Sequence, residues 1–179
     1  MIGLDPARRR FARWALIATV AAFAVGVAGE KWFVRYWQVA FAPTRDLCLP
    51  WRVLLADRSL NAPVERGDLV WLYPDLVAVG ASSAKLLPFK PEHRFVKLVA
   101  GVAGDEIEVS AKGVFINGHY WGELDLLSSL GRDAAFFYRK QVVPPDHYLV
   151  MGSATRSFDS RYWGPIPLPR IIGHAKVLY

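Results

Sequence analysis

One lysine, Lys97, stands in the middle of an apolar run that extends from Phe95 to Val99. A short apolar run is typical of a buried strand, yet lysine is among the residues least often buried in proteins. Apolar surroundings disfavour the charged form of an amine, and a lysine in such a place can take a proton from a reacting group. Lys97 is therefore a candidate general base. The alternative is an edge-strand lysine whose amine reaches into solvent.

The composition limits other kinds of chemistry. Cys48 is the only cysteine in the sequence, which excludes an intramolecular disulfide. The histidines are far apart and lack the spacing of metal ligands, so we expect no metal site and no cofactor. The net charge is +6, but several of the positive charges lie together between residues 8 and 13. No basic stretch with interleaved aromatic residues follows, and we expect no nucleic-acid partner.

An uncharged apolar segment extends from Trp14 to Gly29. As a helix it would cover about 24 Å, a little less than the bilayer core, and the aromatic residues Trp32 and Phe33 would extend it. Residues 14–33 are thus predicted to be a transmembrane signal anchor. Arginines precede it and Glu30 follows, so the basic tail 1–13 is predicted to be cytoplasmic and the bulk of the chain outside. A cleaved signal peptide and a buried core helix are the alternatives.

The rest of the chain is predicted to be mainly β. Residues 34–44 are rich in aromatic side chains and are interpreted as an interfacial linker. In the domain formed by residues 45–179, short alternating segments separated by Gly and Pro favour a β-sandwich or a partly open barrel. The Asn117-Gly118 pair is the turn signal of a β-hairpin. The predicted strands are the Lys97 strand and residues 53–55, 69–73, 106–109, 148–151 and 171–179, whereas 74–93 are irregular and 121–141 resemble an insertion.

Four segments of the sequence stand in a distinctive order and spacing: residues 46–50, 66–68, 94–105 and 151–165. Together they resemble the type I signal peptidases, in particular the conjugative-transfer (TraF-like) branch that processes plasmid pilins. The resemblance extends from about Leu47 to the C-terminus and includes the preceding anchor. It implies the fold of that family, a β-sandwich or partly open barrel with an N-terminal transmembrane helix. Within the four segments, residues 95–105 and 157–164 are highly specific as a pair.

The resemblance implies roles for five residues. The family nucleophile is a serine followed by an apolar residue and proline, and Cys48 stands at this place. Lys97 matches the general base, and Ser157 matches the serine whose hydroxyl orients the lysine amine. Asp159 and Arg161 match an ion pair that braces the site. The alternatives are a buried structural cysteine, an ordinary turn serine and a surface ion pair.

Asp46 departs from the family pattern. Many relatives carry Ser or Thr two residues before the nucleophile, where its hydroxyl helps to bind the oxyanion. An ionised carboxylate cannot donate a hydrogen bond. The backbone N–H of Cys48 is therefore the expected oxyanion donor, and the second donor is unidentified.

The expected function is that of a membrane-anchored, signal-peptidase-like endopeptidase with a dyad of Cys48 and Lys97. It would be a single-pass inner-membrane protein with a periplasmic catalytic domain that cleaves the leader of an exported preprotein, in this branch a conjugative propilin. The product would be linear, or cyclic if the pilin's own amine resolves the acyl-enzyme. The alternatives are an inactive membrane-tethered scaffold of the transfer apparatus and a general secretory signal peptidase.

Overall fold

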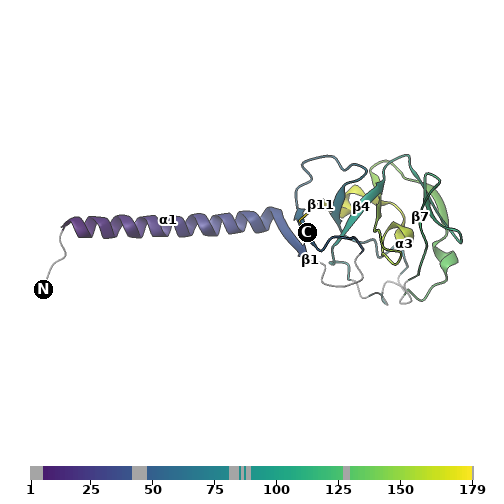
Figure 1. The fold of residues 1–179 in the computed structure, drawn as a ribbon, viewed down its shortest axis with the longest axis horizontal. Helices are drawn as coiled ribbons and strands as arrows, with labels where there is room; N and C mark the ends of the chain where they lie inside the picture. The colour runs from purple at the N-terminus through teal and green to yellow at the C-terminus, as the bar shows by residue number, and fades with distance from the viewer. Residues whose placement is uncertain are drawn as a thin grey trace. The chain divides into compact units, whose positions relative to one another are not determined.

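The computed structural model describes residues 6–41, 48–80, 85, 87, 90–126 and 130–178. The chain divides into two compact units, Met1–Trp37 and Gln38–Tyr179. Figure 1 shows helix α1 in the first unit and mainly β structure in the second. The finer division into tail, anchor, linker and peptidase domain remains a prediction.

Helix α1 extends from Pro6 to Tyr36 and is longer than the predicted anchor. It includes the arginines assigned to the tail, because arginine and alanine favour helix and proline is tolerated in the first turn. The 24 residues from Arg13 to Tyr36 are long and apolar enough to cross a membrane, and none of this stretch is buried within the protein. Trp14 and Phe23, for example, are both more than two-thirds exposed.

The second unit contains two sheets. The larger has the strand order β1-β2-β11-β3-β4-β9-β10, and the smaller has the order β7-β6-β5-β8. All the pairings from β2 to β10, and those of the smaller sheet, are antiparallel. The strands of the larger sheet are Trp37–Phe41 (β1), Val53–Asp57 (β2), Leu69–Leu72 (β3), Phe95–Gly101 (β4), His147–Met151 (β9), Ile166–Pro167 (β10) and Ile171–Val177 (β11).

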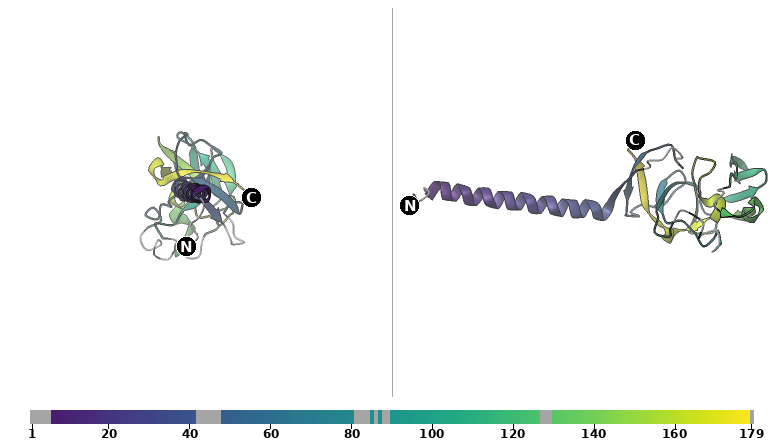
Figure 2. Two further views of the ribbon diagram at one scale, coloured as in Figure 1. Left: turned by 90° about the vertical axis from the view of Figure 1, so that its left-hand side faces the viewer. Right: turned by 90° about the horizontal axis from the view of Figure 1, so that it is seen from below.

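The smaller sheet follows directly after β4. Its strands are Glu106–Ser110 (β5), Gly113–Ile116 (β6), His119–Gly122 (β7) and Arg139–Val142 (β8). Asn117 and Gly118 have φ angles of 51° and 75°, the left-handed backbone of a two-residue hairpin turn, so the predicted turn between β6 and β7 is confirmed. In Figures 1 and 2, β7 and β11 lie at opposite ends of the β unit.

The prediction of a mainly β fold with an N-terminal helix is confirmed, and neither sheet closes into a barrel in the described part of the chain. Three strands had no counterpart in the sequence prediction. β1 lies within the predicted linker, β8 begins inside the predicted insertion, and β10 has only two residues. The described part of the β unit also contains the 3-10 helices Ala134–Phe137 (η2) and Leu168–Arg170 (η3) and the helical turn Ser160–Trp163 (α3).

Strand β4 is central to the larger sheet. Lys97 is opposite Val70 of β3, and the next residue, Leu98, is opposite Met151 of β9. Val70 and Val99 are fully buried in a core that also includes Phe158. The two neighbouring strands therefore fix the lysine backbone on both sides.

The turn between β4 and β5 is braced by Asp105. Its carboxylate accepts hydrogen bonds from Arg66, from the side chain of Asn117 and from the N–H of Val102. Arg66 also donates to the carbonyl of Ala100 at 2.7 Å. Burial opposes ionisation of Asp105, but these hydrogen bonds outweigh it and lower its pKa below the ordinary value of 3.8. Asp105 thus links the two sheets through charged hydrogen bonds.

Asp105→Asn is expected to lower the free energy of unfolding at pH 7 by about 1–3 kcal/mol, because hydrogen-bonded partners lose their charged acceptor. A carboxylate with a lowered folded pKa stabilises the fold above its unfolded pKa, and this contribution disappears as pH falls through the folded value. The stability difference between wild type and variant should therefore shrink below pH 3.8. Urea unfolding at a series of pH values measures it, and a pH-independent difference would contradict the prediction.

Candidate active site

Lys97 is buried and bonded to Ser157. Its side chain enters the protein interior from β4 and is 1% exposed, and Ser157 is completely buried. The amine donates a hydrogen bond to Ser157 Oγ at 2.8 Å. The ring of Phe95 lies 5.6 Å from Nζ. No carboxylate of the described residues forms an ion pair with Lys97, so its one directed polar contact there is the serine hydroxyl.

Asp159 and Arg161 hold the loop that carries Ser157. Both side chains are at most 1% exposed, and Arg161 Nε lies 3.1 Å from Asp159 Oδ1. Asp159 also accepts a hydrogen bond from the N–H of Gly152 at 2.8 Å. Arg161 donates to the carbonyls of Gly152 and Thr155 at 2.7 and 2.6 Å. The ion pair is therefore a buried brace that joins the start of the loop to its end, and not a surface contact.

Helical turn α3 positions this pair. Asp159 caps its N-terminus and accepts a hydrogen bond from the backbone N–H of Arg161. Ser160 Oγ accepts one from the N–H of Val150 in β9. Gly164 ends the turn with a φ of 78°, a conformation that favours glycine. The sequence Asp-Ser-Arg-Tyr-Trp-Gly thus supplies its own cap, its own stop and a link to the sheet.

The backbone of Cys48 contacts the same loop. Its side chain is half-buried, and its carbonyl oxygen accepts a hydrogen bond from the N–H of Ser153 at 2.8 Å. The Ser153 hydroxyl lies 3.4 Å from that oxygen. A Cβ on Gly152 would lie 2.1 Å from Ser157 Oγ and 2.6 Å from the Cys48 carbonyl. Cys48 and the lysine-bound Ser157 therefore flank one glycine that has no room for a side chain.

Sequence reasoning did not assign roles to Ser153, Thr155 or Trp121. Trp121 Nε1 donates to the Gly152 carbonyl at 3.4 Å, which connects β7 of the smaller sheet to the loop. The shorter contact of Ser153 and the contact of Thr155 use backbone atoms, and residue type does not reveal such contacts. Gly152 belongs to the segment 151–165, and the lack of space around it shows why glycine is needed there. Asp46 lies outside the described residues.

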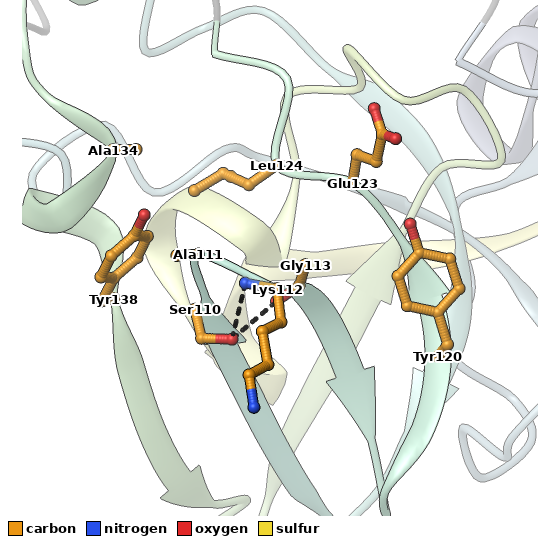
Figure 3. Close-up of a pocket in the computed structure, with 9 residues that line it drawn as sticks. All are labelled: Ser110, Ala111, Lys112, Gly113, Tyr120, Glu123, Leu124, Ala134 and Tyr138. Carbon is orange, nitrogen blue, oxygen red and sulfur yellow. Dashed lines mark hydrogen bonds between the residues drawn. The ribbon is translucent and has the colours of Figure 1, made fainter.

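A separate open pocket of about 290 Å³ lies on the smaller sheet. Figure 3 shows Tyr120 and Tyr138 on two sides of it, with Lys112 between them and Glu123 above. None of the five residues to which the resemblance assigns a role lines it. In the described ranges, no three His, Cys, Asp or Glu side chains are grouped as a metal ion would require.

Comparisons with known proteins show what this chain is similar to. A family model described as "Signal peptidase, peptidase S26" matches residues 9–179. The "Probable conjugal transfer protein TraF" of Sinorhizobium fredii is 33% identical over 171 residues, which cover 89% of this chain and 85% of that protein. The "Probable signal peptidase I-2" of Synechocystis is 34% identical over 116 residues, or 64% of this chain.

The match to the Synechocystis protein spans about half of its length, 48%. A crystal structure of a signal peptidase I from Enterococcus faecalis superimposes with a TM-score of 0.36 and 23% identity, over 68% of this chain and all of that one. The family expected from the four sequence segments is confirmed by the match over almost the whole chain. This chain belongs to the signal peptidase family, peptidase S26.

Proposed function

We propose that this protein is a membrane-anchored endopeptidase that removes the leader of an exported preprotein, with a conjugative propilin as substrate. The observation that carries the proposal is the buried hydrogen bond between Lys97 and Ser157, beside the backbone of Cys48. Family membership supports leader cleavage, and similarity to a conjugal transfer protein supports the propilin. The apolar helix α1 supports a single membrane anchor, with the basic N-terminus inside and the β unit on the periplasmic side.

In the proposed reaction, Cys48 Sγ attacks the carbonyl carbon of the scissile peptide bond as the Lys97 amine takes the thiol proton. The N–H of Cys48 stabilises the oxyanion that forms. The tetrahedral intermediate then collapses, the C–N bond breaks, and the Lys97 ammonium returns the proton to the leaving amine. The products of this half-reaction are a free amine and a thioester on Cys48.

The thioester is resolved in the second half-reaction. If water attacks, Lys97 removes its proton, and the products are a carboxylate and the free thiol of Cys48. Cyclisation requires a different acyl group: if the enzyme cleaves the pilin near its C-terminus, the thioester carries the pilin itself. Attack by the pilin's own N-terminal amine then forms an amide, releases the Cys48 thiol and gives a cyclic product. A thioester reacts well with amines, so both outcomes are compatible with a cysteine nucleophile. Mass spectrometry of the mature pilin distinguishes them, and a linear product excludes cyclisation.

Cys48→Ala tests the proposal directly. Without the sulfur no acyl-enzyme forms, and we expect leader cleavage in cells to fall about 10³-fold or more. Cys48→Ser is the matched variant, because it restores the nucleophile type of the family and keeps the size of the side chain. Precursor and mature pilin are followed by immunoblotting in cells that express the full chain.

Three outcomes would overturn parts of the proposal. Undiminished cleavage by Cys48→Ala removes the thiol from the reaction. Wild-type transfer activity without any cleavage indicates a scaffold. Complementation of a conditional general signal-peptidase mutant indicates a secretory enzyme with a wider substrate range.

A further inference from the structure

Two arginines outside the candidate site converge on one glutamine. Arg94 Nη1 donates to the side-chain oxygen of Gln38 at 3.1 Å, and Arg58 Nη2 donates to the same oxygen at 3.3 Å. Gln38 lies on β1, Arg58 follows β2, and Arg94 precedes β4. Three segments that are far apart in the sequence therefore bring two positive charges onto a single neutral acceptor.

The same two guanidinium groups lie over one aromatic ring. The central carbon of Arg94 is 4.9 Å from the ring centroid of Trp71, and that of Arg58 is 5.6 Å from it. Arg94 is also 5.9 Å from the centroid of Tyr73. Trp71 is only 3% exposed, whereas both arginines are exposed. A buried indole thus forms a fixed platform that orients two solvent-facing cations.

This arrangement lacks a negative partner. Among the described residues, neither Arg58 nor Arg94 forms an ion pair. The neighbouring carboxylate, Asp57, accepts hydrogen bonds from the N–H and hydroxyl of Ser59 instead. The two guanidinium charges repel each other, and an anion bound between them would offset this repulsion. A phosphate group matches the requirement, because its oxygens accept the paired donors of two guanidinium groups.

The covalent position of Gln38 indicates the source of the phosphate. It follows Tyr36, the last residue of α1, by two residues, a span of about 7 Å in extended chain. If α1 crosses a bilayer, as the proposed function requires, connectivity alone keeps Gln38 close to the lipid headgroups. We propose that Arg58 and Arg94, held by Gln38 and Trp71, bind the phosphate of an anionic phospholipid headgroup where α1 ends.

Binding of a soluble short-chain lipid to the full-length protein tests this site. The protein in non-ionic detergent is titrated with dihexanoyl phosphatidylglycerol, and bound lipid is counted by native mass spectrometry. The double variant Arg58→Gln/Arg94→Gln should bind about tenfold or more weakly, since each arginine near an anionic lipid contributes on the order of 1 kcal/mol. Lys112→Gln/Lys140→Gln removes the same charge from the smaller sheet and should bind as wild type does.

Gln38→Glu is the sharper variant. It places a carboxylate where the amide oxygen lies, so the protein supplies its own anion and the site is filled. We expect the same weakening of phosphatidylglycerol binding as in the double arginine variant, with an equal or higher Tm. A variant that had simply failed to fold would lose Tm as well, and this difference separates loss of the site from loss of structure.

The competing ligands decide the assignment. Binding of dihexanoyl phosphatidylcholine as tight as that of phosphatidylglycerol, or equal weakening in the lysine control, overturns the proposal. Competition by glycerol phosphate or by a single-stranded oligonucleotide at the same concentration as the lipid indicates a free phosphate ester or a nucleic acid, and also overturns the proposal.

The proposed function is tested separately, by measuring propilin cleavage and carbonate extraction in parallel. If the wild-type protein does not cleave propilin, or is not inserted in the membrane, the proposed function is refuted. The lipid titration is a separate measurement, so its result is unaffected.

Discussion

Lys97→Met is expected to abolish preprotein cleavage while the β unit stays folded. Methionine has a similar length and suits the buried, largely apolar place of Lys97 beside Phe95. It cannot accept a proton, and general acid–base catalysis accounts for about 10²–10⁴-fold of a rate. A loss of about 10³-fold in the rate of leader cleavage is therefore expected. The measurement is the single-turnover rate with full-length enzyme and a purified preprotein, with circular dichroism to confirm folding.

Ser157→Ala separates orientation from proton transfer. Its hydroxyl receives the hydrogen bond from the Lys97 amine, so the variant keeps the base and loses the group that aims it. We expect a smaller loss than in Lys97→Met, in the cleavage rate and not in substrate binding. Ser157→Thr keeps the hydroxyl and should recover part of the cleavage rate.

The Lys97→Met prediction has its own contradicting outcome. A cleavage rate of Lys97→Met within about tenfold of the wild-type rate would show that Lys97 is not the general base.

Arg161→Met is expected to destabilise the protein by about 3–5 kcal/mol, because it leaves the buried charge of Asp159 without its partner. It also removes the donors to the carbonyls of Gly152 and Thr155, so the loop around Ser157 should lose its fixed conformation. Denaturant unfolding of the full chain in detergent measures the loss. Cleavage should fall in the fraction that remains folded.

The double variant Asp159→Asn/Arg161→Met provides the comparison. It removes both charges, and its destabilisation should be clearly smaller than the sum of the two single losses. Additive losses would show that the two side chains act independently, which would contradict the role of the pair as one brace. Exposed pairs such as Lys140 with Glu106 should contribute much less by the same measurement, because water screens their charges.

Much of the site could be predicted, because the local sequence around its residues indicates the strand and the turn on which they lie. The apolar run around Lys97 indicated a buried strand, and the structure has that strand as β4. The segment from Ser157 to Gly164 contains a cap, an arginine and a stop, which together define α3. The hairpin at Asn117 and Gly118 was also predictable, since few residues adopt a left-handed backbone.

Other parts depend on partners that are distant in the sequence. Arg139-Lys-Gln-Val142 lacks a strong strand pattern and becomes β8 through its pairing with β5. Trp37–Phe41 resembled an interfacial segment because of its aromatic residues, yet it is an edge strand beside β2. The contact of the Cys48 carbonyl with Ser153 connects two backbones. Backbone contacts of this kind have no signature in residue types.

The bond between Lys97 and Ser157 joins residues that are 60 positions apart, and β4 needs both β3 and β9 beside it. Lys97 and Ser157 are therefore not brought together on a nascent chain until β9 and α3, near the C-terminus, have emerged. Under the proposed function, a newly synthesised copy stays latent while its own anchor passes through the translocation machinery. Such latency would limit premature cleavage of neighbouring exported proteins.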